Sequence, residues 1–456
     1  MSDTAPVPPP KPPRIGPNAV KLIAVGAMLL LLLVPHWMIA GLIEEREQRR
    51  DGVVQEIAQS WGRGQVLAGP LLRLPYRVAV VEKPGEPPVW RRGTLMVPPT
   101  DLRAEVALAP ETRRRGLFEA TVYTAAIDLS GSFNLAGLTP PRTGDPAAAG
   151  TGPVPLPAAE FLWPEAQLVL GSNDLRLAAA ETPLRWGDRT LPLAEGGIDP
   201  TQDREPCIAA ETLRWSPGLQ AAPEGASPFA LRLELRGTGS FHMLPLARRL
   251  RLGISGNWAT SSFTGRELPA SSQVTAEGFA AGWTTTTRQP LSRGSLCAGA
   301  AGEGIGVELL EAVPTYRMVN RASKYIVFFL ALAFITYGIF EVVARVRIHP
   351  LQYGLLGASV VLFPLLLLAL GEPLGFAPAY GIAAALVAGQ ASLFTAATTA
   401  SARLGGILAA VCAALFGFLY VVLSLEAFAL LAGALALFAA LSLVMAVSRR
   451  VEWGMR

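Results

Sequence analysis

Histidine is scarce in this 456-residue chain, which contains only three. His36 lies in a long apolar run and His349 in a short basic flank, so the polar middle of the chain has His242 alone. One chain cannot build a multi-histidine zinc site there, and the HExxH motif is absent. The sequence indicates no metal site, and we interpret His242 as a packed or hydrogen-bonded strand residue rather than a general base.

Other catalytic motifs are also absent. The sequence has no Gly-x-Ser-x-Gly elbow, no Walker A pattern, and no serine three residues before any lysine. No cofactor is indicated, and we expect a protein without catalysis of its own. Carboxylates are plentiful, so an acid–base pair stays open as an alternative.

Charged residues are few, at 16%, whereas hydrophobic residues make up 51% and the mean hydropathy is +0.37. This composition is too apolar for a soluble protein of this length. A membrane-spanning helix needs roughly 20 apolar residues to cross about 30 Å of hydrocarbon. We predict a membrane protein with six transmembrane α-helices, one N-terminal and five C-terminal, at residues 22–43, 325–344, 351–370, 376–399, 404–425 and 427–447.

The basic residues of the short flanks predict the orientation, because Lys and Arg resist translocation. Three of them precede the first span, and alternate loops contain further arginines, whereas the opposite loops offer Glu372 and Glu426 without a basic residue. Both termini are therefore expected in the cytoplasm and the large domain outside. No A-x-A pattern precedes Glu44, so the first span is expected to be an uncleaved anchor.

The predicted spans divide the chain into five parts. A Pro-rich, disordered cytoplasmic tail (1–18) precedes the first helix (19–43), an exported mainly-β domain (44–322), a five-helix bundle (323–448) and a cytoplasmic end (449–456). The exported domain has 29 basic and 30 acidic residues. It lacks the positive charge that nucleic-acid binding requires.

Alternating polar and apolar residues predict β-strands in the exported domain. LRLELRG at 231–237 and RLRLGIS at 249–255 follow the strand period of two. The segment after the first span has a different pattern, because Val54, Ile57 and Trp61 share one helical face. It predicts a helical stalk that packs on the domain.

Cysteine is as scarce as histidine, with three residues. Cys412 falls in an apolar run and is expected to pack as a small apolar residue. Cys207 and Cys297 both lie in the exported domain, where an oxidising compartment permits a disulfide. The sequence does not give the Cα separation that a bridge requires, so a disulfide and two separate buried thiols both stay open.

An irregular motif, SGNWATSSFTGRELP, occupies residues 255–269. The spacing of Trp258, Phe263, Gly265 and Pro269 fits neither a strand nor a helix, so we predict a structured loop whose aromatic side chains pack against the sheet. Loops held in this way often carry recognition. These four residues are the candidate recognition motif, with packing alone as the alternative.

One carboxylate lies inside the second apolar segment. Glu341 is 17 residues beyond Lys324, about 25 Å along a helix, which places it near the cytoplasmic edge of the membrane. Arg345 follows four residues later, in the order that favours an i, i+4 pair. We predict an interfacial ion pair between Glu341 and Arg345, with a proton relay as the alternative.

The fourth span combines small and polar residues. Gly381, Ala385 and Gly389 recur at four-residue spacing, and Gln390 and Thr395 add polar side chains. This pattern predicts close helix packing with hydrogen bonds between helices, and a substrate path or a lateral lipid groove is the alternative.

Six motifs, in their order and spacing, resemble the CreD family of bacterial inner membrane proteins. The likeness covers nearly the whole chain, apart from the Pro-rich tail and the loop at 138–159. It implies an inner (cytoplasmic) membrane location, a periplasmic domain, and a role in envelope integrity or stress response, but no known reaction. The motifs are GPLLRLPY (69–76), SGNWATSSFTGRELP (255–269), GFAAGW (278–283), YRMVNRASKYIVFFLALAFITYGIFE (316–341), HPLQYGLLG (349–357) and FLYVVLSLEAFALLAGALALF (418–438).

We therefore expect a non-catalytic inner membrane protein of envelope maintenance, whose periplasmic domain binds an envelope component or a partner protein. A transport or lipid-handling protein is the first alternative, and a polar cavity beside the fourth span would distinguish it. An envelope enzyme is the second, and it would need a cleft lined by carboxylates or by His242. The lipid bilayer is a further expected partner, and the sequence does not indicate the oligomeric state.

Overall fold

The computed structural model describes residues 17–80, 87–140, 158–175, 182–194, 211–287, 304–310 and 315–424, with Leu431, Ala434, Leu435, Phe438, Ser442 and Met445. Most of the predicted tail and all of 449–456 lie outside them. The chain forms two compact units. The β unit comprises residues 51–312, and the helical unit joins residues 1–50 to 313–456.

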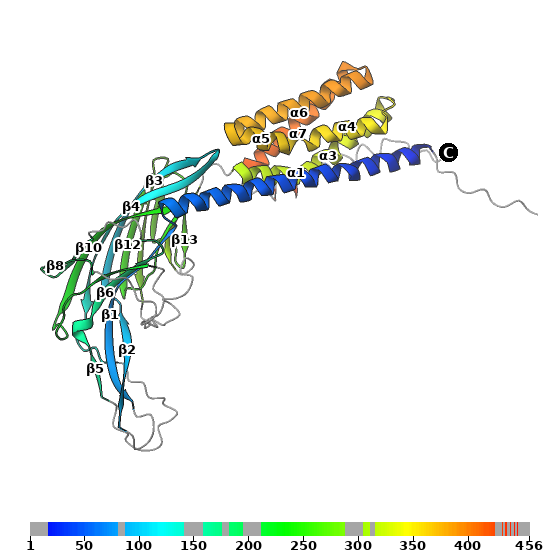
Figure 1. Ribbon diagram of the computed structural model, residues 1–456. Helices are drawn as coiled ribbons and strands as arrows, with labels where there is room; N and C mark the ends of the chain where they lie inside the picture. Colours follow the sequence, from blue (N-terminus) through cyan, green and yellow to red (C-terminus); the bar gives the residue numbers. More distant parts are fainter. Residues whose placement is uncertain are drawn as a thin grey trace, which may run out of the picture. The chain divides into compact units, whose positions relative to one another are not determined.

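Within the described residues the β unit has two eight-stranded sheets (Figure 1). The first has the order β13-β16-β11-β1-β6-β9, with β2 and β5 also paired to β1, and the second has the order β14-β15-β12-β3-β4-β10-β7-β8. A 3-10 helix, η2, covers Trp163–Glu165. The strands are β1 (Gln65–Val80), β2 (Val89–Val97), β3 (Asp101–Arg115), β4 (Phe118–Asn134), β5 (Ala159–Phe161), β6 (Gln167–Ser172), β7 (Leu184–Trp186), β8 (Arg189–Leu191), β9 (Glu211–Trp215), β10 (Ala226–Thr238), β11 (Ser240–Met243), β12 (Arg249–Gly256), β13 (Ser261–Gly265), β14 (Ser271–Val274), β15 (Phe279–Thr286) and β16 (Ile305–Leu309).

The predicted alternation places one face of each long strand in a common core. Leu231, Leu233 and Leu235 of β10 are buried, while the arginine and glutamate residues between them are exposed. One hydrophobic cluster takes residues from the inner faces of both sheets. Tyr123 of β4 and Phe241 of β11 meet edge to face in it, with ring centroids 6.5 Å apart. Burial of these faces is the main force that holds the two sheets together.

The last turns of α1 (Pro17–Trp61) pack on the β unit, as the stalk pattern predicts. The Nε1 of Trp61 donates a hydrogen bond to the carbonyl of Tyr123 at 3.2 Å. The guanidinium groups of Arg113 and Arg236 lie 4.3 and 4.5 Å from the centre of the Trp61 ring, a cation–π arrangement. Ile57 is half-buried on the same face of the helix.

The helical unit contains the apolar segments. Five described helical segments are long and apolar enough to cross a membrane: α1, α3 (Thr315–Val343), α4 (Pro350–Val361) together with α5 (Phe363–Leu374), α6 (Phe376–Thr399) and α7 (Ala402–Ser424). The predicted sixth segment, 427–447, lies largely outside the described residues. The chain is thus a membrane protein with about five apolar helices and a large mainly-β domain after the first.

The third predicted span lies within one apolar segment, Pro350–Leu374, but this segment forms two helices instead of the single helix expected over 351–370. Helix α4 ends at Val361, and α5 begins at Phe363. Pro364 has no N–H to donate to the carbonyl of Val360, and its ring would crowd that carbonyl in a continuous helix. The break at Leu362 therefore follows from one residue that the sequence displays.

Candidate functional site

The candidate recognition motif contains a strand that the sequence did not reveal. Ser261–Gly265 forms β13 and pairs antiparallel with β16, so the prediction of a loop throughout is wrong. The prediction that the aromatic residues pack on the sheets is confirmed. The ring centroid of Phe263 lies 6.1 Å from that of Phe279 and 6.0 Å from that of Trp283. Trp258 Nε1 donates a hydrogen bond to the carbonyl of Leu310 at 2.8 Å.

The other two residues of this motif lie at the end of the strand and in the loop that follows it. Gly265 has a φ of 115°, and a Cβ there would lie 1.9 Å from the carbonyl oxygen of Gly304, so only glycine fits. Pro269 lies in the loop between β13 and β14 and is half-buried. All four candidate residues thus contribute to one edge of the β unit.

His242 lies on β11 with 4% of its surface exposed, and its Nε2 is 3.0 Å from Thr264 Oγ1. This confirms a packed, hydrogen-bonded strand residue. Burial lowers the pKa of His242 below 6.5, and the nearby Glu308 opposes this shift to a smaller extent. Across the described ranges, no three His, Cys, Asp or Glu side chains form a group that could hold a metal ion.

The cysteines give no further information on the site. Cys207 and Cys297 lie outside the described residues, so a disulfide and two separate thiols both stay open. Cys412 of α7 is buried in the core of the helical unit as a free thiol, as expected for a small apolar residue.

Glu341 forms an ion pair, but with a different partner from the predicted one. Its Oε1 contacts Lys21 Nζ of α1 and accepts a hydrogen bond from the backbone N–H of Ile348 at 2.9 Å. Arg345 lies beyond the end of α3 at Val343, with a left-handed φ of 54°, and is exposed. The predicted Glu341–Arg345 pair is therefore wrong, because the helix does not continue to position i+4.

A second carboxylate contact, involving Glu372, joins three helices of the helical unit. Glu372 lies inside α5, not in a loop as the sequence suggests, and its side chain is 13% exposed. Its Oε1 accepts a hydrogen bond from the Tyr316 hydroxyl of α3 at 3.1 Å and lies 3.9 Å from Arg46 Nη1 of α1. The sequence gives no local signal for this contact, because its members are far apart in the chain.

The polar residues of α6 bond to neighbouring helices. Thr395 Oγ1 lies 2.7 Å from the hydroxyl of Tyr337 on α3, and Gln390 accepts from Ser359 of α4 at 2.9 Å. These contacts confirm the packing interpretation for both residues. The prediction of close helix packing is wrong for the two glycines. Gly381 and Gly389 are exposed, and a Cβ on either would meet no atom within 4 Å.

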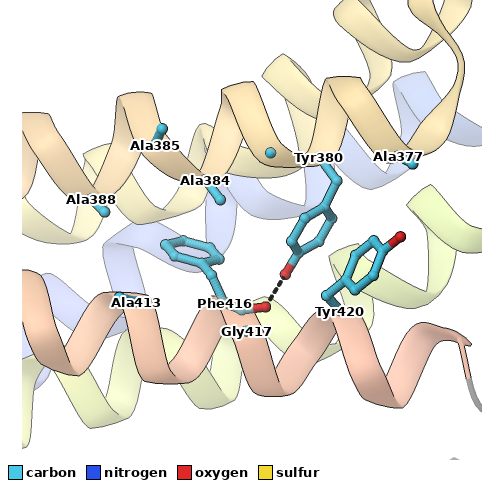
Figure 2. A pocket seen from close by; sticks show the side chains of 10 residues that line it. Ala377, Tyr380, Ala384, Ala385, Ala388, Ala413, Phe416, Gly417 and Tyr420 are labelled. Carbon is cyan, nitrogen blue, oxygen red and sulfur yellow. Dashed lines mark hydrogen bonds between the residues drawn. The ribbon is translucent and has the colours of Figure 1, made fainter.

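An apolar groove of about 480 Å³ lies between α6 and α7 (Figure 2). Its described lining is alanine, glycine and aromatic, and the Tyr380 hydroxyl is turned to the carbonyl of Phe416 at 2.6 Å. Figure 2 shows Tyr380 and Tyr420 on facing helices at one side of the groove. This is not the polar cavity expected of a transporter for polar substrates, since no charged side chain occurs among the described lining residues.

Comparison with known proteins gives one clear relationship. The family model described as "Inner membrane protein CreD" matches residues 17–454. Inner membrane protein CreD of Escherichia coli (strain K12) is 25% identical over 453 residues, covering 95% of this chain and 93% of the relative. A solved M1 zinc metallopeptidase from Deinococcus radiodurans covers 50% of this chain and 52% of its own, at 8% identity and a TM-score of 0.20, which carries no inference. From the match over nearly its whole length, this chain belongs to the CreD family of inner membrane proteins.

Proposed function

We propose that this protein acts without catalysis of its own in envelope maintenance, and that its β unit is exported to the periplasm and binds an envelope component or a partner protein. Family membership supports the envelope setting. The orientation comes from the basic flanks of the spans.

The loop between β13 and β14 is the observation that carries this proposal. It is fixed by bonds from Arg266 N to Gly304 O at 3.0 Å, from Ala270 N to Gly282 O at 2.8 Å, and from Trp283 Nε1 to Glu267 O at 3.1 Å. At its centre Leu268 is 76% exposed. A fixed loop loses little conformational entropy on binding, which suits the presentation of an apolar side chain to a partner.

Photo-crosslinking in intact cells tests this function. A photoreactive amino acid at position 268 should give a specific crosslinked product, and the same group at Leu117, which is 61% exposed in the β3–β4 turn, is the matched control. Trp258→Ala should remove the product at 268 while the protein is retained in the membrane. Equal products from both positions, or none from position 268, would contradict the proposal.

Lipid handling is the second candidate function, and the apolar groove between α6 and α7 favours it. Acyl chains suit a lining of alanine, glycine and aromatic side chains. Gly381→Leu would add bulk to the groove at a position where a Cβ meets no atom within 4 Å, whereas Gly389→Leu adds the same bulk at an equally open position outside the described lining. A photoactivatable phospholipid should label the wild type and Gly389→Leu, but not Gly381→Leu; equal labelling of all three would exclude this groove as the lipid site.

A further inference from the structure

A depression of about 340 Å³ lies over the second sheet, where β3, β4, β12 and β15 run side by side. Three arginines, one aspartate and hydroxyl groups line it. The side chains that matter here are Asp101, Arg103, Arg249, Arg251, Thr284 and Thr286.

The strand register brings these side chains together. Arg251 pairs with Arg103 across the parallel strands β12 and β3, and it pairs with Thr284 on β15. Arg249 lies two residues away on the same face, opposite Asp101 and Thr286. Alternate residues of a strand share one face, so these form two adjacent rows above the same sheet surface.

The arginines differ in how their charge is compensated. Arg249 makes two contacts with Asp101, at 2.6 and 2.7 Å, and Arg103 Nε donates to Glu105 Oε1 at 3.1 Å. No described residue forms an ion pair or hydrogen bond with the side chain of Arg251. Arg251 therefore places an uncompensated positive charge directly beside Arg103, whose own charge is compensated by Glu105, so a bound anion would stabilise Arg251.

We propose that this depression binds the phosphate group of a phosphorylated glycerol or sugar component of the envelope. Guanidinium groups match phosphate geometry, and a tetrahedral phosphate offers acceptor oxygens to more than one arginine at once. A planar carboxylate is satisfied by one guanidinium, as Asp101 is by Arg249. The hydroxyls of Thr284 and Thr286 beside the arginines suit a polyol. This inference rests on the proposed function, because it names the ligand class that the β unit would bind.

Calorimetric titration of glycerol 1-phosphate into the full chain in neutral detergent at low salt tests the proposal. We expect saturable binding that glycerol does not show, and binding about tenfold weaker in Arg251→Gln, since a charge-assisted contact is lost. Arg185→Gln, at an exposed arginine of β7 away from the depression, is the matched control and should bind as the wild type does. Thermal unfolding verifies that both variants fold.

Three outcomes would overturn the inference. These are the lack of saturation up to about 10 mM, equal binding by Arg251→Gln and the wild type, and equal binding of glycolate, which carries a carboxylate instead of a phosphate. The crosslink at position 268 separates this inference from the proposed function. If that crosslink forms while glycerol phosphate fails to bind, a partner is still captured and only the phosphate site is wrong.

Discussion

Strand β10 and helix α6 expose opposite kinds of residue. Along β10 the exposed side chains include Arg232 and Glu234, and the leucines between them are buried. Along α6 the exposed side chains include Leu386 at 54% and Leu393 at 74%, while Thr395 is fully buried. Exposure therefore means contact with water in the β unit and contact with lipid in the helical unit. The same rule, that each surface matches its solvent, produces both patterns.

Buried polar groups extend this comparison. In the β unit, Gln65 Nε2 donates to the carbonyls of Asp174 and Arg236 at 2.9 and 2.6 Å, and Ser172 donates to its Oε1 at 2.5 Å. In the helical unit, polar pairs such as Tyr337 with Thr395 join one helix to another. Unfolding in water offers new partners to the first set, whereas unfolding within lipid offers few except other protein groups.

The largest expected effect concerns the side of the membrane on which the β unit and the loop after α3 lie. Alkaline phosphatase, which is active only after export, should be highly active when fused after Trp283 and nearly inactive when fused after Arg347, because the basic flank retains the second site inside. An active fusion at Arg347 would break the comparison, since the loop after α3 would then lie outside.

Removal of one hydroxyl from each core sharpens the comparison. The Tyr123 hydroxyl donates to the carbonyl of Ser240 at 2.6 Å, and the Tyr337 hydroxyl lies 2.7 Å from Thr395 Oγ1. We expect Tyr123→Phe to lower the free energy of unfolding by about 1–3 kcal/mol, because a buried carbonyl loses its donor. Tyr337→Phe should cost about 0.6 kcal/mol, the typical value between membrane helices. Thermal unfolding in detergent measures both, and equal losses would remove the distinction.

Neutralisation of the interfacial carboxylate should have a smaller effect. Glu341→Gln removes the ion pair with Lys21 but keeps an oxygen that can accept from the N–H of Ile348. Both side chains are partly exposed, so we expect a loss below about 1 kcal/mol in the same assay. Arg345→Gln is the control and should have no effect on the pair. Loss of envelope protection in cells by a folded Glu341→Gln protein would favour the proton relay instead.

The smallest expected effect is a dependence of the free energy of unfolding on pH, caused by His242 in the β unit. The folded chain holds the pKa of His242 below 6.5, whereas the unfolded chain has the ordinary value. As the pH falls below about 6.5, the unfolded chain takes up the proton first, so stability decreases until the folded pKa is passed. Above that range His242 is neutral in both states and contributes no slope. His242→Gln should flatten this part of the stability curve; an unchanged curve would assign the slope to other groups.

The period of apolar residues predicts those elements whose own sequence shows which face is buried, whatever they pair with. Apolar and polar residues alternate along most of strand β10, and the stalk has Ile57 and Trp61 at helical spacing. In both, the local sequence indicates which face is buried. Strand β13 gives no such indication, because SSFTG is five residues long and its burial does not alternate: four half-buried residues are followed by the exposed Gly265. Its partner β16 begins 40 residues after Gly265, and only that pairing makes it a strand.

The same limit explains the carboxylate partners. The i, i+4 spacing of Glu341 and Arg345 predicts a pair, but helix α3 ends at Val343, before Arg345. Lys21 lies 320 residues away, and no pattern in the sequence around it indicates that it pairs with Glu341. Long-range contacts of this kind depend on how the helices assemble, which one sequence does not contain.

The two ion contacts of α1 define a length. Lys21 and Arg46 are 25 residues apart on one continuous helix, which corresponds to about 37 Å. Their partners, Glu341 and Glu372, come from different helices of the helical unit, and the hydrocarbon layer of a typical bilayer is about 30 Å thick. The spacing is long enough to place both ion contacts outside a hydrocarbon layer of that thickness. In a thinner or thicker membrane, α1 would have to tilt or release one of these contacts, so acyl-chain length would act on the helix whose last residues belong to the β unit.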